Sequence, residues 1–330
     1  MKPRVAIIGS GSWATALAKL LLNNLDSIYW YQRKQEDVEY FREFGNNPRY
    51  LTSVEFDIQK IHFFTSLSEC FKSAEYFILA VPSAFLHDTL SVLKKEELKD
   101  KRFFSAIKGI VPQYNLIVGE YLNKHFDVPL ENIGVITGPC HAEEVALEKL
   151  SYLTVASVNA GSAKTVSELL NCRYLKSTVS DDIYGTEYSA VLKNVVAVAG
   201  GICHGLGYGD NFLAVLVSNA IQEIKRFVDA VHPIDRDIKA SAYLGDLLVT
   251  AYSQFSRNRM FGTMLGKGYS VKQAQLEMNM IAEGYYAVKC VHEINKKYKV
   301  NMPITTAVYN IIYGGGQVKK EIVNLSNLLS

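Results

Sequence analysis

Short apolar runs alternate with helical patterns over the first half of the chain. The runs are rich in β-branched and aromatic residues, which favours strands, and the segments between them repeat apolar residues at helical spacing. Strands joined by crossover helices form a parallel sheet. The pattern predicts strands at RVAIIG (4–9), SIYWYQ (27–32), YFILAV (76–81), FFSAI (103–107), NIGVIT (132–137) and YLTVAS (152–157).

The pattern changes near Gly185, after which long segments place Ala, Leu, Val, Lys and Glu at helical spacing with few strand signals. We therefore expect an α/β domain with a doubly wound sheet over residues 1–185 and an all-helical domain over residues 186–330. Three glycines in YGGGQ, 313–317, should break a helix and leave a short tail whose order the sequence does not define. We attach no function to residues 314–330.

Composition narrows the class of protein. The 330 residues are 48% hydrophobic, with 35 Lys and Arg against 33 Asp and Glu, so no strong overall charge calls for nucleic acid or an anionic membrane. The five cysteines form no CxxC pair, which is typical of a reducing compartment. The first apolar run is too short for a signal peptide, and no run has the length of a membrane span. These features predict a cytoplasmic, soluble protein.

A glycine motif follows the first predicted strand. In GSGSWA, Gly9 and Gly11 precede Ala14 and a helix rich in Ala and Leu, which fits G-x-G-x-x-A. Such glycines allow a tight turn and the approach of a pyrophosphate to the backbone, while the helix N-terminus supplies free N–H groups. In this strand and helix context the motif predicts a Rossmann-type site for a dinucleotide.

The second predicted strand ends about 20 residues after the glycines, where an acidic residue would bind the ribose of NAD. The chain has Gln32, Arg33 and Lys34 there instead. We expect Gln32 and Arg33 to contact the cofactor. Without a carboxylate at this position, the site can accept a 2′-phosphate. The sequence therefore does not decide whether the cofactor is NAD or NADP.

One lysine lies inside an apolar helix. Lys193, in EYSAVLKNVVAVAGG, is surrounded along the helix by Ala, Val and Leu, so no face is polar enough for an ordinary solvated side chain. Either its stem is buried while the amine reaches water, or the amine has a chemical role. Burial lowers the pKa of an amine, which would make such a lysine a usable base near neutral pH.

Further polar groups follow predicted strands and helices. Lys108 comes directly after a strand, where open α/β sheets bind ligands, and Gly138 with Pro139 forms a turn before a helix that begins near Ala142. A later segment places Asp246 and Thr250 one helical turn apart. The same segment then concentrates groups suited to a phosphate monoester: Ser256, Arg257, Asn258 and Arg259.

The motifs EYSAVLKNVVAVAGG and GDLLVTAYSQFSRNR, behind an N-terminal GxGxxA, closely resemble those of the bacterial NAD(P)-dependent glycerol-3-phosphate dehydrogenases, over about residues 4–313. The resemblance implies reversible hydride transfer between NAD or NADP and dihydroxyacetone phosphate or sn-glycerol 3-phosphate, the precursor of phospholipids. It implies that Lys193 is the catalytic acid–base and that the enzyme is a homodimer.

The resemblance also implies the remaining site residues. The implied substrate-binding residues are Lys108, Gly138, Cys140, Lys193, Asp246, Ser256, Arg257 and Asn258. The implied cofactor-binding residues, together with Gly9, Gly11, Gln32 and Arg33, are Ser12, Trp13, Lys108, Ala142, Arg257, Ile281 and Glu283.

The chain departs from the family pattern at three places. The family usually has Ser or Thr and then Phe where this chain has Cys140 and His141, and a thiol is the weaker hydrogen-bonding partner. The family more often has Asp in the position of His204, and it more often has a Thr-Arg-Gly triplet near residues 218–220. We interpret the chain as a divergent member with its chemistry intact.

The sequence supports two other interpretations and a metal site less well. No two histidines have the i, i+3 or i, i+4 spacing of a helical metal site, so we expect no metal. A related two-domain dehydrogenase for a hydroxy acid or 6-phosphogluconate is the nearest alternative enzyme, because Arg257 could bind a carboxylate as well as a phosphate. A nucleotide-sensing protein without catalysis is the alternative from another class, but it would have little need for Lys108, Lys193 and Asp246 together.

Overall fold

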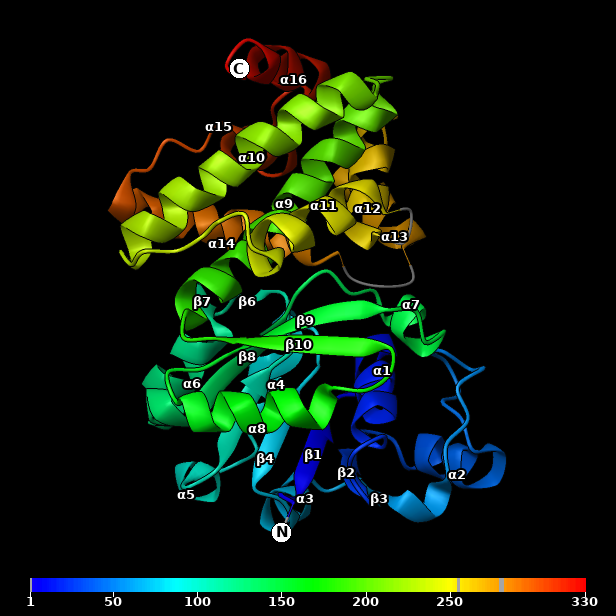
Figure 1. Cartoon of the computed structure of the whole chain (residues 1–330). Coiled ribbons are helices and arrows are strands. Elements are labelled where there is room, and N and C mark those ends of the chain that lie inside the picture. Colours follow the sequence, from blue (N-terminus) through cyan, green and yellow to red (C-terminus); the bar gives the residue numbers. More distant parts are fainter. Residues whose placement is uncertain (1, 254–255, 279–281) are drawn as a thin grey trace. The chain divides into compact units, whose positions relative to one another are not determined.

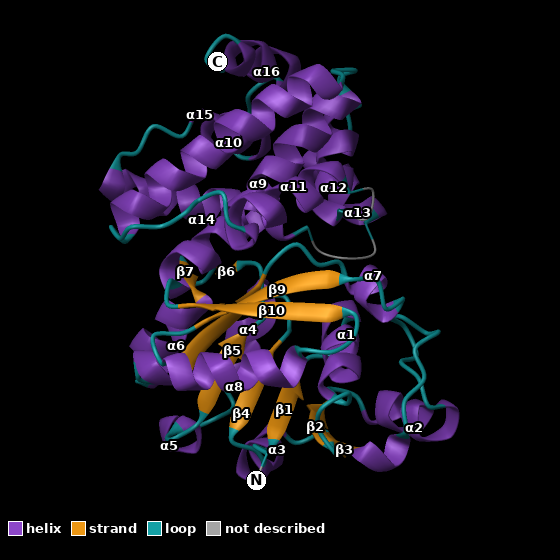
Figure 2. Cartoon of the chain, viewed as in Figure 1, coloured by secondary structure: helices purple, strands orange, loops and turns teal. Residues whose placement is uncertain are grey.

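The computed structural model describes residues 2–253, 256–278 and 282–330. The chain divides into two compact units (Figure 1). The first contains Met1–Ile107 and Val118–Ile183, and the second contains Lys108–Ile117 and Tyr184–Ser330. The first unit combines a large sheet with helices and the second is mostly helical, which agrees with the predicted fold class (Figure 2).

The first unit is built on an eight-stranded sheet in the order β10-β9-β8-β5-β4-β1-β2-β3. Neighbouring strands are parallel, except that β8 and β9 are antiparallel. Six of its strands coincide with predicted runs, whereas β3 and β10, at the two edges, were not predicted. The strands are β1 Val5–Ile8, β2 Ile28–Tyr31, β3 Ile61–Phe64, β4 Tyr76–Leu79, β5 Arg102–Ser105, β8 Ile133–Thr137, β9 Ser151–Ala156 and β10 Leu175–Ser180.

Helices cover this sheet. Every residue of β1 and β4 is buried, which requires packing on both faces. Helix α1 contacts α7 and α8, so these three pack as one group. The helices are α1 Ser12–Leu21, α2 Gln35–Phe44, α3 Leu67–Ser73, α4 Leu86–Leu90, α5 Lys95–Leu98, α6 Val118–Phe126, α7 Ala142–Ala146 and α8 Ala160–Leu170, with short 3₁₀ turns η1 Ile58–Lys60, η2 Ser83–Phe85 and η3 Leu130–Asn132.

The second unit is helical apart from a small antiparallel hairpin (Figure 2). The predicted break at the three glycines falls between α15 and α16. The residues after it form α16, because Ile322 and Leu325 pack into the core. The elements are β6 Ile110–Val111, β7 Leu116–Ile117, α9 Ile183–Gly205, α10 Asp210–Val231, the π-helical turn η4 Ser241–Gly245, α11 Asp246–Tyr252, α12 Arg257–Gly266, α13 Val271–Glu277, α14 Glu283–Tyr298, α15 Pro303–Ile312 and α16 Val318–Ser326.

Helix α9 is the centre of this unit. Its residues 185–203 are all buried, which explains why the sequence there is apolar all round. Helix α12 approaches α9 closely at Gly262, where an added Cβ would lie 2.1 Å from the carbonyl oxygen of Val198. Only glycine permits this contact. The two helices therefore lie backbone against backbone, and side chains near this contact meet in a dry environment.

Two further features concern the helices and the cysteines. Among the described residues, no helix combines the length and the apolar character that a membrane crossing needs. All five cysteines are free thiols. Burial raises the pKa of Cys70, Cys203 and Cys290 to about 12, so these thiols stay protonated and serve as packing residues.

Candidate active site

Two lysines converge on one carboxylate in the second unit. Asp246, the first residue of α11, is 1% exposed, and Lys193 on α9 is 5% exposed. The Lys193 ammonium donates a hydrogen bond to Oδ1 of Asp246. Lys108, just before β6, donates to the same oxygen over 3.1 Å. The structure thus shows that Lys193 has a buried charge partner and does not reach water as a solvated side chain would.

The electrostatics of this triad follow from burial. Burial lowers the pKa of Lys193 to about 7, because an ammonium is costly away from water; Asp246 opposes this and Lys108 adds to it. Burial alone would raise the pKa of Asp246, but the charges of Lys108 and Lys193 outweigh it and hold that pKa below its usual value. The triad therefore holds a permanent carboxylate beside an amine that can gain or lose a proton near neutral pH.

A chain of amide hydrogen bonds fixes the backbone around the triad. Asn194 donates from Nδ2 to the carbonyl oxygen of Lys108 over 2.6 Å. Asn258 on α12 donates from Nδ2 to Oδ1 of Asn194 over 2.9 Å, and its own Oδ1 accepts the N–H of Gly284 over 2.9 Å. Four separate segments are thereby held in one arrangement. The bonding of Asn194 and Gly284 was not anticipated, since no local pattern links residues so far apart.

The start of α12 holds the other predicted substrate residues. Ser256 is the N-cap of this helix, and its hydroxyl accepts the N–H of Arg259 over 3.3 Å. Arg257 is the first helical residue and is exposed, whereas Asn258 is buried. Ser256 and Asn258 thus have hydrogen-bond partners in the structure, and Arg257 is an exposed residue at the positive end of the helix.

The glycine loop in the first unit has the features of an anion-binding turn. Gly9 has φ +138°, and a Cβ there would lie 2.5 Å from the carbonyl oxygen of Ala80, so only glycine fits. Gly11 is the N-cap of α1, where no side chain caps the helix and a Cβ would meet nothing within 4 Å. Ser12 and Trp13 open the helix. The free N–H groups and the open space beside Gly11 fit a pyrophosphate.

Unsatisfied polar atoms mark the same region. In the described part of the chain, the buried Nε1 of Trp13 has no hydrogen-bond partner, and neither amide atom of Gln32 has one. Gln32 directly follows β2 and is 1% exposed. Leaving buried donors and acceptors unpaired costs free energy, so such atoms point to a missing ligand. The residues present therefore fit a bound dinucleotide.

The remaining predicted residues are spread over both units. In the first unit, the thiol of Cys140 donates to the carbonyl oxygen of Tyr152 over 3.0 Å, in the turn between Gly138 and the start of α7 at Ala142. In the second unit, Glu283 opens α14, while His204 is exposed in the last turn of α9. Ile281 lies outside the described residues. Within the described residues, no group of three or more His, Cys, Asp or Glu could hold a metal ion.

The fold and this arrangement of residues define the class: a two-unit dehydrogenase that uses a nicotinamide dinucleotide. Comparison with known families identifies the member. Residues 4–163 match the NAD-dependent glycerol-3-phosphate dehydrogenase N-terminus, and residues 182–323 match the C-terminus of the same family. The chain therefore belongs to the NAD(P)-dependent glycerol-3-phosphate dehydrogenase family.

Individual members of this family are similar to the chain over nearly its full length. A glycerol-3-phosphate dehydrogenase [NAD(P)+] of Bacillus velezensis is 33% identical over 325 residues, which cover 98% of this chain and 93% of the relative. One of an Exiguobacterium species is 34% identical over 97% of this chain and 94% of the relative. The crystal structure of the Coxiella burnetii enzyme has a TM-score of 0.90 at 28% identity and covers 98% of both chains. The predicted family, fold class, reaction class and NAD(P) dependence are confirmed; the roles of single site residues stay predictions.

Proposed function

We propose that this enzyme interconverts dihydroxyacetone phosphate and sn-glycerol 3-phosphate with Lys193 as the acid–base. The observation that carries the assignment is the convergence of Lys193 and Lys108 on the buried Asp246. Oxidation of a secondary alcohol requires removal of the hydroxyl proton as hydride leaves carbon. The bound nicotinamide supplies the hydride acceptor, and the neutral amine of Lys193 takes the proton.

The neighbours of Lys193 set its protonation state. Asp246 stabilises the ammonium form and Lys108 disfavours it, so the amine can act as a base in one direction and as an acid in the other. We propose that Lys108 also binds the substrate oxygen and contacts the cofactor. The side chain of Lys108 is 18% exposed, more than that of Lys193, which supports a role for Lys108 at the edge of the triad.

The phosphate of the substrate is assigned to the start of α12. Arg257 can bind two phosphate oxygens at once, and the N-terminal end of a helix favours an anion. Ser256 and Asn258 flank it, and Asn258 connects this segment to the lysine triad through Asn194. Neutralising the phosphate here would favour phosphorylated three-carbon substrates over free ones. We further assign Gly138 and Cys140 to substrate binding.

The cofactor is assigned to the glycine loop. Gly9, Gly11, Ser12 and Trp13 would hold the pyrophosphate and its neighbours, while Gln32 and Arg33 would meet the adenosine end. Unpaired polar atoms of Trp13 and Gln32 support this placement. Further cofactor contacts are assigned to Lys108, Ala142, Arg257, Ile281 and Glu283.

We also infer a cytoplasmic homodimer whose product supplies glycerol 3-phosphate for phospholipid synthesis. The family resemblance supports the dimer and the metabolic role, and the free thiols support a reducing compartment.

Static light scattering of the purified chain measures the mass directly, and a monomeric mass at working concentration contradicts the dimer.

Lys193→Ala should reduce kcat by about 10³-fold, because it removes the proton carrier from the reacting oxygen. Cofactor binding should persist, since the glycine loop is untouched. The measurement is NADH and NADPH oxidation with dihydroxyacetone phosphate. Lys225→Ala, which removes an exposed lysine paired with Asp229 on α10, is the matched control and should keep full activity. A Lys193→Ala variant that keeps more than a tenth of the wild-type activity would contradict the assignment of Lys193 as the acid–base.

The rate of glycerol 3-phosphate oxidation should rise with pH through about 7, because only the neutral Lys193 accepts a proton and burial lowers its pKa to that range. Asp246 raises the pKa of Lys193, so Asp246→Asn should move the rising limb of kcat to lower pH by at least about one unit. A pH series of kcat for both proteins measures this. A shift to higher pH would contradict the proposed coupling.

Arg257→Ala should raise the KM for dihydroxyacetone phosphate by about 10-fold to 100-fold, because it removes a charge-assisted bidentate contact. The weak reduction of dihydroxyacetone, which lacks the phosphate, serves as the internal control and should not change. Steady-state kinetics with both substrates distinguish the outcomes. An unchanged KM for the phosphorylated substrate would take Arg257 out of the site.

A further inference from the structure

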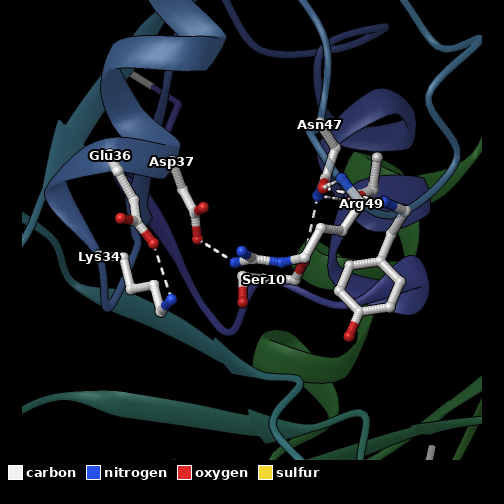
Figure 3. Close-up of polar contacts among 8 residues, drawn as sticks. Ser10, Lys34, Glu36, Asp37, Asn47 and Arg49 are labelled. Carbon is white, nitrogen blue, oxygen red and sulfur yellow. Dashed lines mark hydrogen bonds and ion pairs between the residues drawn. The ribbon is translucent and has the colours of Figure 1, made fainter. Parts of the chain in front are cut away.

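Charged side chains gather where β2 ends and α2 begins. Lys34, Glu36 and Asp37 come from this junction, and Arg49 comes from the following loop; we call these four residues the β2–α2 charge cluster (Figure 3). Lys34 and Glu36 form an ion pair of 2.7 Å, and the Arg49 guanidinium is paired with the Asp37 carboxylate. The hydrogen bond and charge of Lys34 lower the pKa of Glu36, and the charge of Arg49 also contributes, so the two pairs interact.

A buried asparagine attaches this cluster to the glycine loop. Asn47 is 2% exposed and donates from Nδ2 to the carbonyl oxygen of Ser10 over 3.0 Å and to Oγ1 of Thr15 over 2.9 Å. Its Oδ1 accepts the N–H groups of Arg49, over 2.9 Å, and of Tyr50, over 3.0 Å. Arg49 is therefore fixed relative to the loop that fits the pyrophosphate (Figure 3).

The position of the cluster relates it to the adenosine ribose. In this fold the residue at the end of β2 reaches the ribose of a dinucleotide bound at the first glycine loop. That residue is Gln32, whose amide is buried and unpaired in the described part of the chain. An amide can bond a ribose hydroxyl as donor or acceptor and can donate to a phosphate, whereas a carboxylate would repel a 2′-phosphate.

The cations near this position are not equally available. Lys34 and Arg49 are each paired with a carboxylate, while exposed Arg33 has no carboxylate partner among the described residues. An exposed cation that already has an ion-pair partner must lose it, or share it, to bind a phosphate. The net positive charge open to a 2′-phosphate is therefore close to that of Arg33 alone.

We propose that the β2–α2 charge cluster determines how strongly this enzyme distinguishes NADP from NAD. Arg33 and the neutral Gln32 admit the 2′-phosphate, while Glu36 and Asp37 neutralise Lys34 and Arg49 and so prevent a strong preference for NADP. The wild type should bind NADH and NADPH with Kd values within about tenfold of each other. The inference rests on the proposed function, because it takes the glycine loop as the cofactor site.

Removing the carboxylates should shift binding toward NADPH. Glu36→Gln frees the Lys34 ammonium and should lower the Kd for NADPH by about threefold. Asp37→Asn frees the Arg49 guanidinium, which can bind two phosphate oxygens at once. This variant should lower the Kd for NADPH by about tenfold. The Kd for NADH should change by less than about twofold, and added salt should reduce both gains. Arg33→Gln should act oppositely and raise the Kd for NADPH by about tenfold.

The chain carries its own reporter for this binding. Its two tryptophans are Trp13, in the first turn of α1, and Trp30, whose Nε1 donates to the carbonyl oxygen of Gly9 over 2.7 Å. Quenching of their fluorescence by NADH and by NADPH, without substrate, gives both Kd values independently of turnover. Glu39→Gln is the matched control, since it removes one negative charge from α2 at a residue whose described contact is with Gln35 and with no cation.

The outcomes separate the possibilities. A lower NADPH Kd in Glu36→Gln and Asp37→Asn, but not in Glu39→Gln, supports the inference. Three results overturn it: equal changes in Glu36→Gln and Glu39→Gln, unchanged ratios of the NADH and NADPH Kd values in the two cluster variants, or wild-type Kd values that differ by more than about tenfold. Failure of the wild type to bind either cofactor overturns the proposed function itself. Glu36 is exposed, so its variant remains informative even if Asp37→Asn does not fold.

Discussion

The buried pairing of Asp246 with two lysines is the constraint on which the rest of the site depends. A single charge in this dry position would cost several kcal/mol, so the Asp246 carboxylate is stable there only while at least one of the two lysines is charged. With Lys108 charged and Lys193 neutral, the triad carries no net charge; protonation of Lys193 makes it positive. Burial therefore favours the neutral amine, and the same apolar helix that makes Lys193 unusual in the sequence supplies the reason for its reactivity.

The sequence predicted the inner strands of the sheet and failed at its edges. Inner strands such as β1 and β4 are buried along their whole length and stand out as apolar runs. Strand β10, LKSTVS, is an edge strand with only Leu175 buried, so its polar residues hide the pattern. Strand β3 is the other edge and is similarly only partly buried. Local hydrophobicity reports burial, and an edge strand is stabilised by pairing that a single segment cannot reveal.

The chemical types of the site residues were predictable, but their contacts were not. Lys108 follows β5 in sequence, and a local interpretation attaches it to the sheet. It belongs instead to the helical unit, where Asn194 binds its carbonyl oxygen. Lys108 and Asp246 share a hydrogen bond although 138 positions separate them, and no periodic pattern carries information over that distance. The family motifs identified Lys108, Lys193 and Asp246 as site residues. Only the tertiary structure shows that both lysines donate hydrogen bonds to the same oxygen of Asp246.

Pairing a cation with a carboxylate has opposite consequences at the two places where this chain uses it. In the triad, Asp246 and Lys193 are almost inaccessible, so their interaction is strong and partly offsets the lowering of the Lys193 pKa by burial. At the start of α2, Lys34 and Glu36 are largely exposed, so water and salt weaken the pair and leave Lys34 competent to exchange partners. Burial thus decides whether a pair fixes a chemical property or only adjusts a preference. A protein can keep its reaction constant at the first kind of pair while its choice of cofactor changes at the second.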